Sequence, residues 1–163
     1  MSAKRASSKK SGKSVQSQII DGLTDAYWKE METVQNYIAA SSNLDGVDAD
    51  PIKKALAGDI TEEVGHAQQL ANRIRVLGGV VPGSMTFKAS QKNLQPTKDS
   101  TDVVAVIKGV IEAENDGIAG YMKLIRLCDG VDYGTQDLCI ALMTDEEDHR
   151  REFEGFLKQY KKR

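Results

Sequence analysis

The chain has 163 residues, of which 40% are hydrophobic and 28% charged, so it is long enough for one domain with a packed core and too apolar for wholesale disorder. Its net charge of −2 hides a segregation, because residues 1–16 carry +5, residues 158–163 carry +4, and the segment between them carries −11. No apolar run of ~18 residues could span a membrane, no secretory signal is expected at the N-terminus, and two cysteines cannot form a disulfide framework.

Residues 1–16 are rich in Lys and Ser and lack apolar periodicity, so we expect a flexible basic arm. A first helix is predicted over about residues 15–44, because apolar side chains recur there at intervals of three and four. A second helix is predicted to begin at Asp50, as an N-cap before Pro51, and to end at the two glycines of residues 78–79.

Two further helices are predicted after a connector of about 20 residues, one over about 102–129 and one over about 135–160. Four similar amphipathic segments, joined by two short turns and one long connection, favour an all-α fold. We expect a four-helix bundle of two antiparallel hairpins over residues 17–160, in which the connector crosses the length of the bundle. A basic C-terminal end at 161–163 follows it.

One glutamate interrupts the apolar stripe of each predicted helix. These residues are Glu30, Glu63, Glu114 and Glu146. A carboxylate buried alone costs several kcal/mol, so each one needs a compensating partner. Buried ion pairs would be the simplest partner, but neither Lys nor Arg occupies the stripes at that height.

Both histidines of the chain follow one of these glutamates by three residues, as Glu63–His66 and Glu146–His149, and side chains at i and i+3 share a helix face. At 1.5 Å per residue, the four glutamates fall at nearly the same height in the bundle. We therefore expect four carboxylates and two imidazoles to converge, a ligand set that suits two iron or manganese ions. By position, the two glutamates before the histidines would bridge the ions, the other two would be terminal, and each histidine would hold one ion.

With these residues placed, residues 17–160 resemble the ferritin superfamily, and most of all the Dps-like mini-ferritins that keep a bacterioferritin-type di-iron centre inside each subunit. The resemblance is carried by Glu30 with Tyr37 seven residues later, the run EEVGHAQQLANRI at 62–74, Glu114 with Tyr121 seven residues later, and DEEDH at 145–149. It implies a cytoplasmic ferroxidase with two irons per subunit. Such a protein oxidises Fe(II) with hydrogen peroxide or oxygen, stores the ferric product in a hollow homo-oligomer, and protects against oxidative stress. The same ligands would accept manganese or zinc in a crystal.

Three departures from the family pattern refine this expectation. Val64 stands where bacterioferritin has its haem-binding methionine, so no haem is expected. No fifth helix is predicted, which in the superfamily favours a shell of 12 subunits over one of 24. The first helix has no histidine, which argues against the intersubunit centre of true Dps proteins.

Two residue pairs near this set have open roles. Tyr37 and Tyr121 lie two turns from ligand glutamates. Core packing with a satisfied hydroxyl is expected, and the alternative is a hydrogen bond to a ligand or a radical-accepting role. Cys128 and Cys139 could face each other, and small buried hydrophobes are favoured over a redox pair.

The basic arm is a candidate DNA-binding segment through Lys4, Arg5, Lys9, Lys10 and Lys13. Many copies on a shell would bind DNA phosphates without sequence preference, and would associate the protein with the nucleoid. A merely solubilising tail is the alternative. Two other functions also stay open: a different di-metal enzyme, such as a manganese catalase or a peroxidase, and a structural DNA-compacting protein in which the metal site is secondary.

Overall fold

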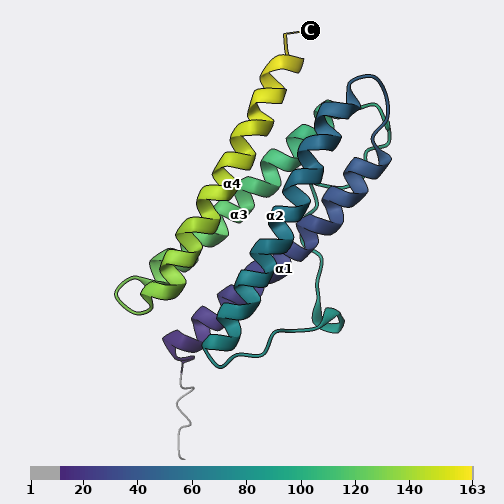
Figure 1. Ribbon diagram of the computed structural model, residues 1–163. Coiled ribbons are helices and arrows are strands. Elements are labelled where there is room, and N and C mark those ends of the chain that lie inside the picture. Colours follow the sequence, from purple (N-terminus) through teal and green to yellow (C-terminus); the bar gives the residue numbers. More distant parts are fainter. Residues whose placement is uncertain (1–11, 163) are drawn as a thin grey trace, which may run out of the picture.

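The computed structural model describes residues 12–162, and within them the chain forms four long helices and no strand (Figure 1). The elements are α1 (Val15–Asn43), α2 (Ala49–Val76), the single 3-10 turn η1 (Ser84–Thr86), α3 (Val103–Cys128) and α4 (Tyr133–Tyr160). Helix α1 packs against α2 and α3 against α4 as antiparallel hairpins, which confirms the predicted all-α four-helix bundle. In this part of the chain, no helix is both long and apolar enough to cross a membrane.

The helix starts show where the predicted boundaries hold. Asp102 caps α3, because its side chain accepts a hydrogen bond from the backbone N–H of Ala105. The predicted N-cap of α2 is wrong: this helix begins at Ala49, so Asp50 and Pro51 both lie inside its first turn. That turn tolerates them, because its N–H groups lack intrahelical acceptors and the helix dipole favours an acidic side chain there.

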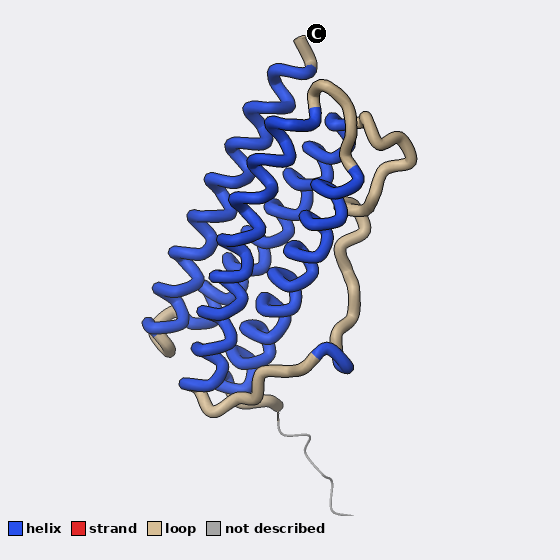
Figure 2. The backbone as a smooth tube through the Cα atoms, turned by 45° about the vertical axis from the view of Figure 1, so that its right-hand side comes forward, coloured by secondary structure: helices blue, strands red, loops and turns tan. Residues whose placement is uncertain are grey.

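The connector between α2 and α3 runs the length of the bundle, as predicted for parallel α2 and α3 (Figure 2). It is fastened to α1 by the buried Glu32, which accepts hydrogen bonds from the backbone N–H groups of Ser90 at 2.6 Å and Gln91 at 2.8 Å. Gln91 also donates to Thr33 at 2.6 Å and accepts from Asn36 at 2.9 Å. We call these five residues the connector clamp.

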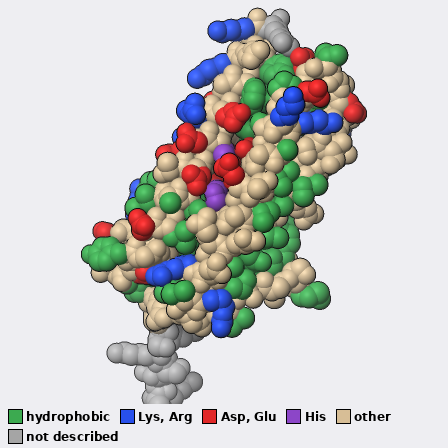
Figure 3. Space-filling view, viewed as in Figure 1, with side chains coloured by type: hydrophobic (Ala, Val, Ile, Leu, Met, Phe, Trp, Pro, Cys, Tyr) green, Lys and Arg blue, Asp and Glu red, His purple; other side chains and the backbone are tan. Residues whose placement is uncertain are grey.

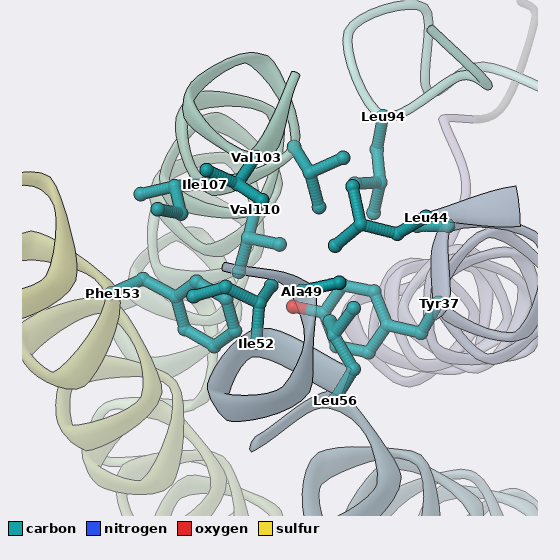
Figure 4. Packing of buried hydrophobic residues seen from close by; sticks show 12 residues of the cluster. Tyr37, Leu44, Ala49, Ile52, Leu56, Leu94, Val103, Ile107, Val110 and Phe153 are labelled. Atoms are coloured by element: carbon teal, nitrogen blue, oxygen red, sulfur yellow. The ribbon is translucent and has the colours of Figure 1, made fainter. Parts of the chain in front are cut away.

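Beyond the clamp, the connector inserts Leu94 between the ends of α1 and α3. Figure 4 shows Leu94 next to Leu44 and Val103 in a cluster of buried apolar side chains. Gly109 of α3 allows this close approach, because a Cβ atom there would lie 2.9 Å from the carbonyl oxygen of Asn93.

Glu32→Ala is expected to destabilise the fold by about 2 kcal/mol, because it leaves two backbone donors of the connector without their charged acceptor. Hydrogen exchange of residues 84–95 should accelerate more than that of the helices. Urea unfolding and exchange mass spectrometry measure both effects. Glu112→Ala, at an exposed position of α3, is the control; equal exchange in the two variants would contradict a fastening role for Glu32.

The core consists of two apolar clusters, one towards each end of the bundle. One cluster includes Tyr37, Ile52 and Phe153, and the other includes Leu23, Tyr121, Cys128 and Cys139. Both cysteines are free and fully buried, and burial raises their thiol pKa, that of Cys139 to about 12. They serve as small buried side chains, and the layer between the two clusters is left to polar groups.

Candidate metal centre

Six buried side chains meet in that polar layer, and they are the six that the sequence predicts. Each helix supplies one glutamate near its midpoint, and α2 and α4 each add a histidine almost one turn later. None is more than 6% exposed. The residues are Glu30, Glu63, His66, Glu114, Glu146 and His149.

The Nδ1 atom of each histidine faces the carboxylates of both Glu63 and Glu146. His66 Nδ1 lies 3.3 Å from Glu63 Oε2 and 3.3 Å from Glu146 Oε1. His149 Nδ1 lies 3.4 Å from Glu63 Oε1 and 3.8 Å from Glu146 Oε2. Glu63 and Glu146 therefore lie between two imidazoles whose ring centres are 6.2 Å apart.

Two overlapping groups of four residues could each hold a cation. One group is Glu30, Glu63, His66 and Glu146, and the other is Glu63, Glu114, Glu146 and His149. Within each group, one ligand atom per residue lies within 4.8 Å of the others. Glu63 and Glu146 belong to both groups, so each could contact two cations, and the carboxylate and imidazole donors suit iron or manganese.

The hydrogen bonding of these residues provides a test of that fit. Six buried side-chain atoms of the described residues lack a partner in hydrogen-bond geometry: Oδ2 of Asp59, both carboxylate oxygens of Glu63, Oε1 of Glu146, and Nδ1 of both His66 and His149. Five of them belong to the two groups, where histidine and carboxylate atoms lie 3.3–3.4 Å apart without hydrogen-bond geometry. Buried polar atoms in native proteins are nearly always hydrogen-bonded, and a pair of cations within the two groups would coordinate all five.

The two tyrosines hold the outer carboxylates by hydrogen bonds across the α1–α3 seam. Tyr37 of α1 donates to Glu114 of α3, and Tyr121 of α3 donates to Glu30 of α1. Both rings are at most 2% exposed, so packing and hydrogen bonding occur together. Burial raises the pKa of both phenols, and the adjacent carboxylates raise it further, which keeps them protonated donors.

Burial and mutual contact distribute protons unevenly over the centre. Burial raises the pKa of Glu30 and Glu114 well above the usual range, and the neighbouring carboxylates add to it. Burial alone would lower the pKa of the histidines, but the carboxylates outweigh it and raise that of His66 to about 10 and that of His149 to about 12. Protons in the centre therefore favour the two imidazoles and the carboxyl groups of Glu30 and Glu114. They favour Glu63 and Glu146 least, because hydrogen bonds to these two carboxylates outweigh burial and lower their pKa.

Three acidic residues near the centre were not predicted from the sequence. His149 Nε2 lies 2.9 Å from Glu62 Oε2 and 3.9 Å from Asp59 Oδ1, and His66 Nε2 lies 3.3 Å from Asp145 Oδ2. Figure 3 shows the histidine side chains reaching the surface between α2 and α4, with acidic side chains around them. Carboxylates that accept from Nε2–H leave the Nδ1 lone pair free for a cation.

The sequence contained a signal for these three residues. Asp59 lies four residues before Glu63, on the same helix face, and burial raises its pKa to about 6. Glu62 directly precedes Glu63, and Asp145 directly precedes Glu146, so both lie at the edge of the buried stripe.

Of the basic residues predicted to bind DNA, four lie outside the described residues: Lys4, Arg5, Lys9 and Lys10. Lys13 is exposed and pairs with Asp21 on the first turns of α1, with its Nζ 2.5 Å from the carboxylate.

Comparisons with known proteins bear on the family and the fold of the chain. Residues 20–163 match the Ferritin family, described as a ferritin-like domain. The chain is 24% identical over 141 residues to a DNA protection during starvation protein of Pyrococcus furiosus, which covers 85% of this chain and 76% of the relative. It is 28% identical over 132 residues to a bacterioferritin of Brucella melitensis, covering 80% and 77%. The solved dodecameric thioferritin of Bacteroides fragilis shares the fold, with a TM-score of 0.79 at 22% identity over 90% of this chain and 88% of that one.

Proposed function

Because the chain belongs to the family of ferritin-like domains, we propose that it is a ferroxidase that binds Fe(II) inside its helical bundle, oxidises it with hydrogen peroxide or oxygen, and stores the ferric product. The observation that carries this proposal is the pair of overlapping four-residue groups, whose ligand atoms lie within 4.8 Å of one another and include five buried atoms with no partner in hydrogen-bond geometry. Two Fe(II) ions would share Glu63 and Glu146, and each would take one histidine and one further glutamate.

The residues of the chain would bind the Fe(II) ions, fix the orientation of the ligands and limit the access of water. The two apolar clusters cover the polar layer towards the two ends of the bundle. Tyr37 and Tyr121 hold the terminal carboxylates in one orientation, so that the ligand positions are set before metal arrives. When bound, the iron pair supplies the electrons. With hydrogen peroxide, each of two Fe(II) ions loses one electron, the O–O bond breaks, and two protons complete two water molecules.

The storage function is tested by adding Fe(II) and then hydrogen peroxide to the purified protein. We expect ferric iron to be retained and to elute with the protein, and we expect a homo-oligomer of 12 subunits, as in the thioferritin of similar fold. Size-exclusion chromatography with light scattering and iron analysis measures both. A catalase would instead release oxygen from peroxide without added iron, and that result would contradict the proposal.

We also propose that the basic arm binds DNA without sequence preference. Two observations favour it: the arm's charge of +5 over residues 1–16, and the relative in Pyrococcus furiosus described as a DNA protection protein. Deleting residues 1–12 is expected to abolish plasmid retardation, while Lys13 and the α1 cap residue Ser14 remain.

Retardation by the intact protein should weaken steeply with salt, because arm lysines release phosphate counterions. The charge-neutral variant Lys4→Gln/Arg5→Gln/Lys9→Gln/Lys10→Gln keeps the arm's length and should behave like the deletion. Undiminished retardation by either variant would show that the arm is only a tail.

A further inference from the structure

A second approach to the centre lies on the face opposite the histidines. Between α1, α3 and the connector is a cavity of about 710 Å³, whose walls include Pro82, Trp28 and Leu124. Going round the bundle, α1 and α3 pack together on one side, and α2 and α4 form the other. We call this cavity the vestibule.

A second cavity of about 30 Å³, which we call the neck, adjoins the vestibule. The two cavities share Lys29, Glu30, Ser90 and Gly117 as lining residues, so they are neighbours. The lining of the neck includes the clamp residue Gln91 and three glutamates of the centre: Glu30, Glu114 and Glu146.

Gly117 is the residue that leaves the neck open. A Cβ atom at this position would lie 3.8 Å from Cγ and Cδ of Glu146, so an alanine would just contact the bridging glutamate and a longer side chain would fill the space. Glycine inside a helix costs about 0.5–1 kcal/mol of stability relative to alanine, so Gly117 does not stabilise α3. Across the mouth, the Lys29 ammonium lies 3.5 Å from the carbonyl oxygen of Asp116.

The volume of the neck and the groups that line it determine which molecules can enter it. A water molecule needs roughly 10–15 Å³ measured in this way, so the neck accommodates about two oxygen-sized groups. Hydrogen peroxide and dioxygen are of that size, whereas Fe(II) with six hydrating waters is several times larger. Four acidic residues line the neck beside Lys29, so its size rather than its charge excludes the hydrated ion; they are Glu30, Glu114, Asp116 and Glu146.

We propose that the neck beside Gly117 is the access route by which a small uncharged oxidant, hydrogen peroxide or dioxygen, reaches the bridging carboxylate Glu146, while Fe(II) arrives by another face. This inference rests on the proposed ferroxidase function. It makes Gly117 a residue that controls oxidant access without binding metal.

The experiment fills the neck in steps with Gly117→Ala, Gly117→Val and Gly117→Leu. Gly155→Leu is the matched control, since Gly155 is an exposed helical glycine with nothing within 4 Å of an added Cβ. Each protein is loaded anaerobically with Fe(II), and nitric oxide, an uncharged diatomic probe, is mixed in while its binding is followed by absorbance. Co(II) uptake, followed by its visible absorption, reports cation access independently.

We expect the rate constant for nitric oxide binding to fall at least about 10-fold in Gly117→Leu and by less in Gly117→Val, because close-packed interiors yield little. Co(II) uptake should be unchanged, and oxidation by hydrogen peroxide and by oxygen should each slow if both use the neck; slowing with one alone assigns the neck to that oxidant. Circular dichroism checks folding, and the smaller substitutions carry the test if the leucine variant does not fold.

Unchanged nitric oxide binding in a folded Gly117→Leu protein that still takes up Co(II) would overturn the inference, as would slowed Co(II) uptake with normal nitric oxide binding. If the wild-type protein takes up no Co(II) or Fe(II), the proposed function itself fails. The Co(II) measurement therefore distinguishes the two failures.

Discussion

Glu146→Gln is expected to lower the initial rate of Fe(II) oxidation by at least about 100-fold, because Glu146 belongs to both groups of possible ligands. Even the loss of a residue that only hydrogen-bonds to a metal ligand lowers metal affinity or activity by about 10–100-fold. The amide keeps the shape of the side chain but removes the charge that would be shared by two cations. Stopped-flow absorbance of the ferric product measures the rate, and Co(II) titration measures the number of ions bound per chain.

Glu147→Gln is the matched control for this change. It makes the same substitution one residue later on the same helix, but Glu147 is exposed and outside both ligand groups. Its oxidation rate and Co(II) stoichiometry should equal those of the wild-type protein. An equal loss in both variants, or an unaffected rate in Glu146→Gln, would place the oxidation site elsewhere.

Binding of two divalent cations is expected to release at least two protons and up to four. The imidazoles of His66 and His149 have pKa values of about 10 and about 12 in the metal-free centre, so both are protonated at pH 7 and must lose a proton to coordinate. Glu30 and Glu114, whose pKa is raised well above the usual range, add the remainder.

The sign of the pH dependence follows. Below pH 10 both imidazoles are protonated, so lowering the pH adds competitor and weakens metal binding. With at least two protons displaced, the constant for binding two ions should fall about 100-fold or more per pH unit between pH 8 and pH 6. Zn(II) titration in weakly buffered solution with a pH indicator counts the protons. Binding without proton release would contradict the protonation state described above.

The four-helix bundle and the meeting of six residues could be predicted because both depend on spacing along single helices. An i and i+3 pair such as Glu63 and His66 shares a face in any helix, and equal distances from the helix ends fix equal heights. The crossed bonds from Tyr37 and Tyr121 could not be predicted in the same way, because they depend on how α1 lies against α3.

The burial of α1 was also broader than its apolar stripe indicated. The apolar side chains spaced by three and four in α1 include Tyr27 and Val34, but both are only half-buried. Glu32 and Asn36, which lie off that spacing, are buried. The physical reason is the connector, which covers a second, polar side of α1 through the clamp. Hydrophobic periodicity detects one apolar face, and it cannot detect a polar surface covered by a loop about 55 residues further along the chain.

The crossed tyrosine bonds have a consequence for the symmetry of the molecule. Each hairpin carries the same ordered set, a glutamate, a tyrosine seven residues later, and a glutamate followed by a histidine, and each hairpin anchors the first glutamate of the other. The bundle thus joins two hairpins that carry the same order of residues. Each four-residue group takes three members from one hairpin and one from the other, so neither hairpin holds a complete group, and both groups form only when the hairpins pack together.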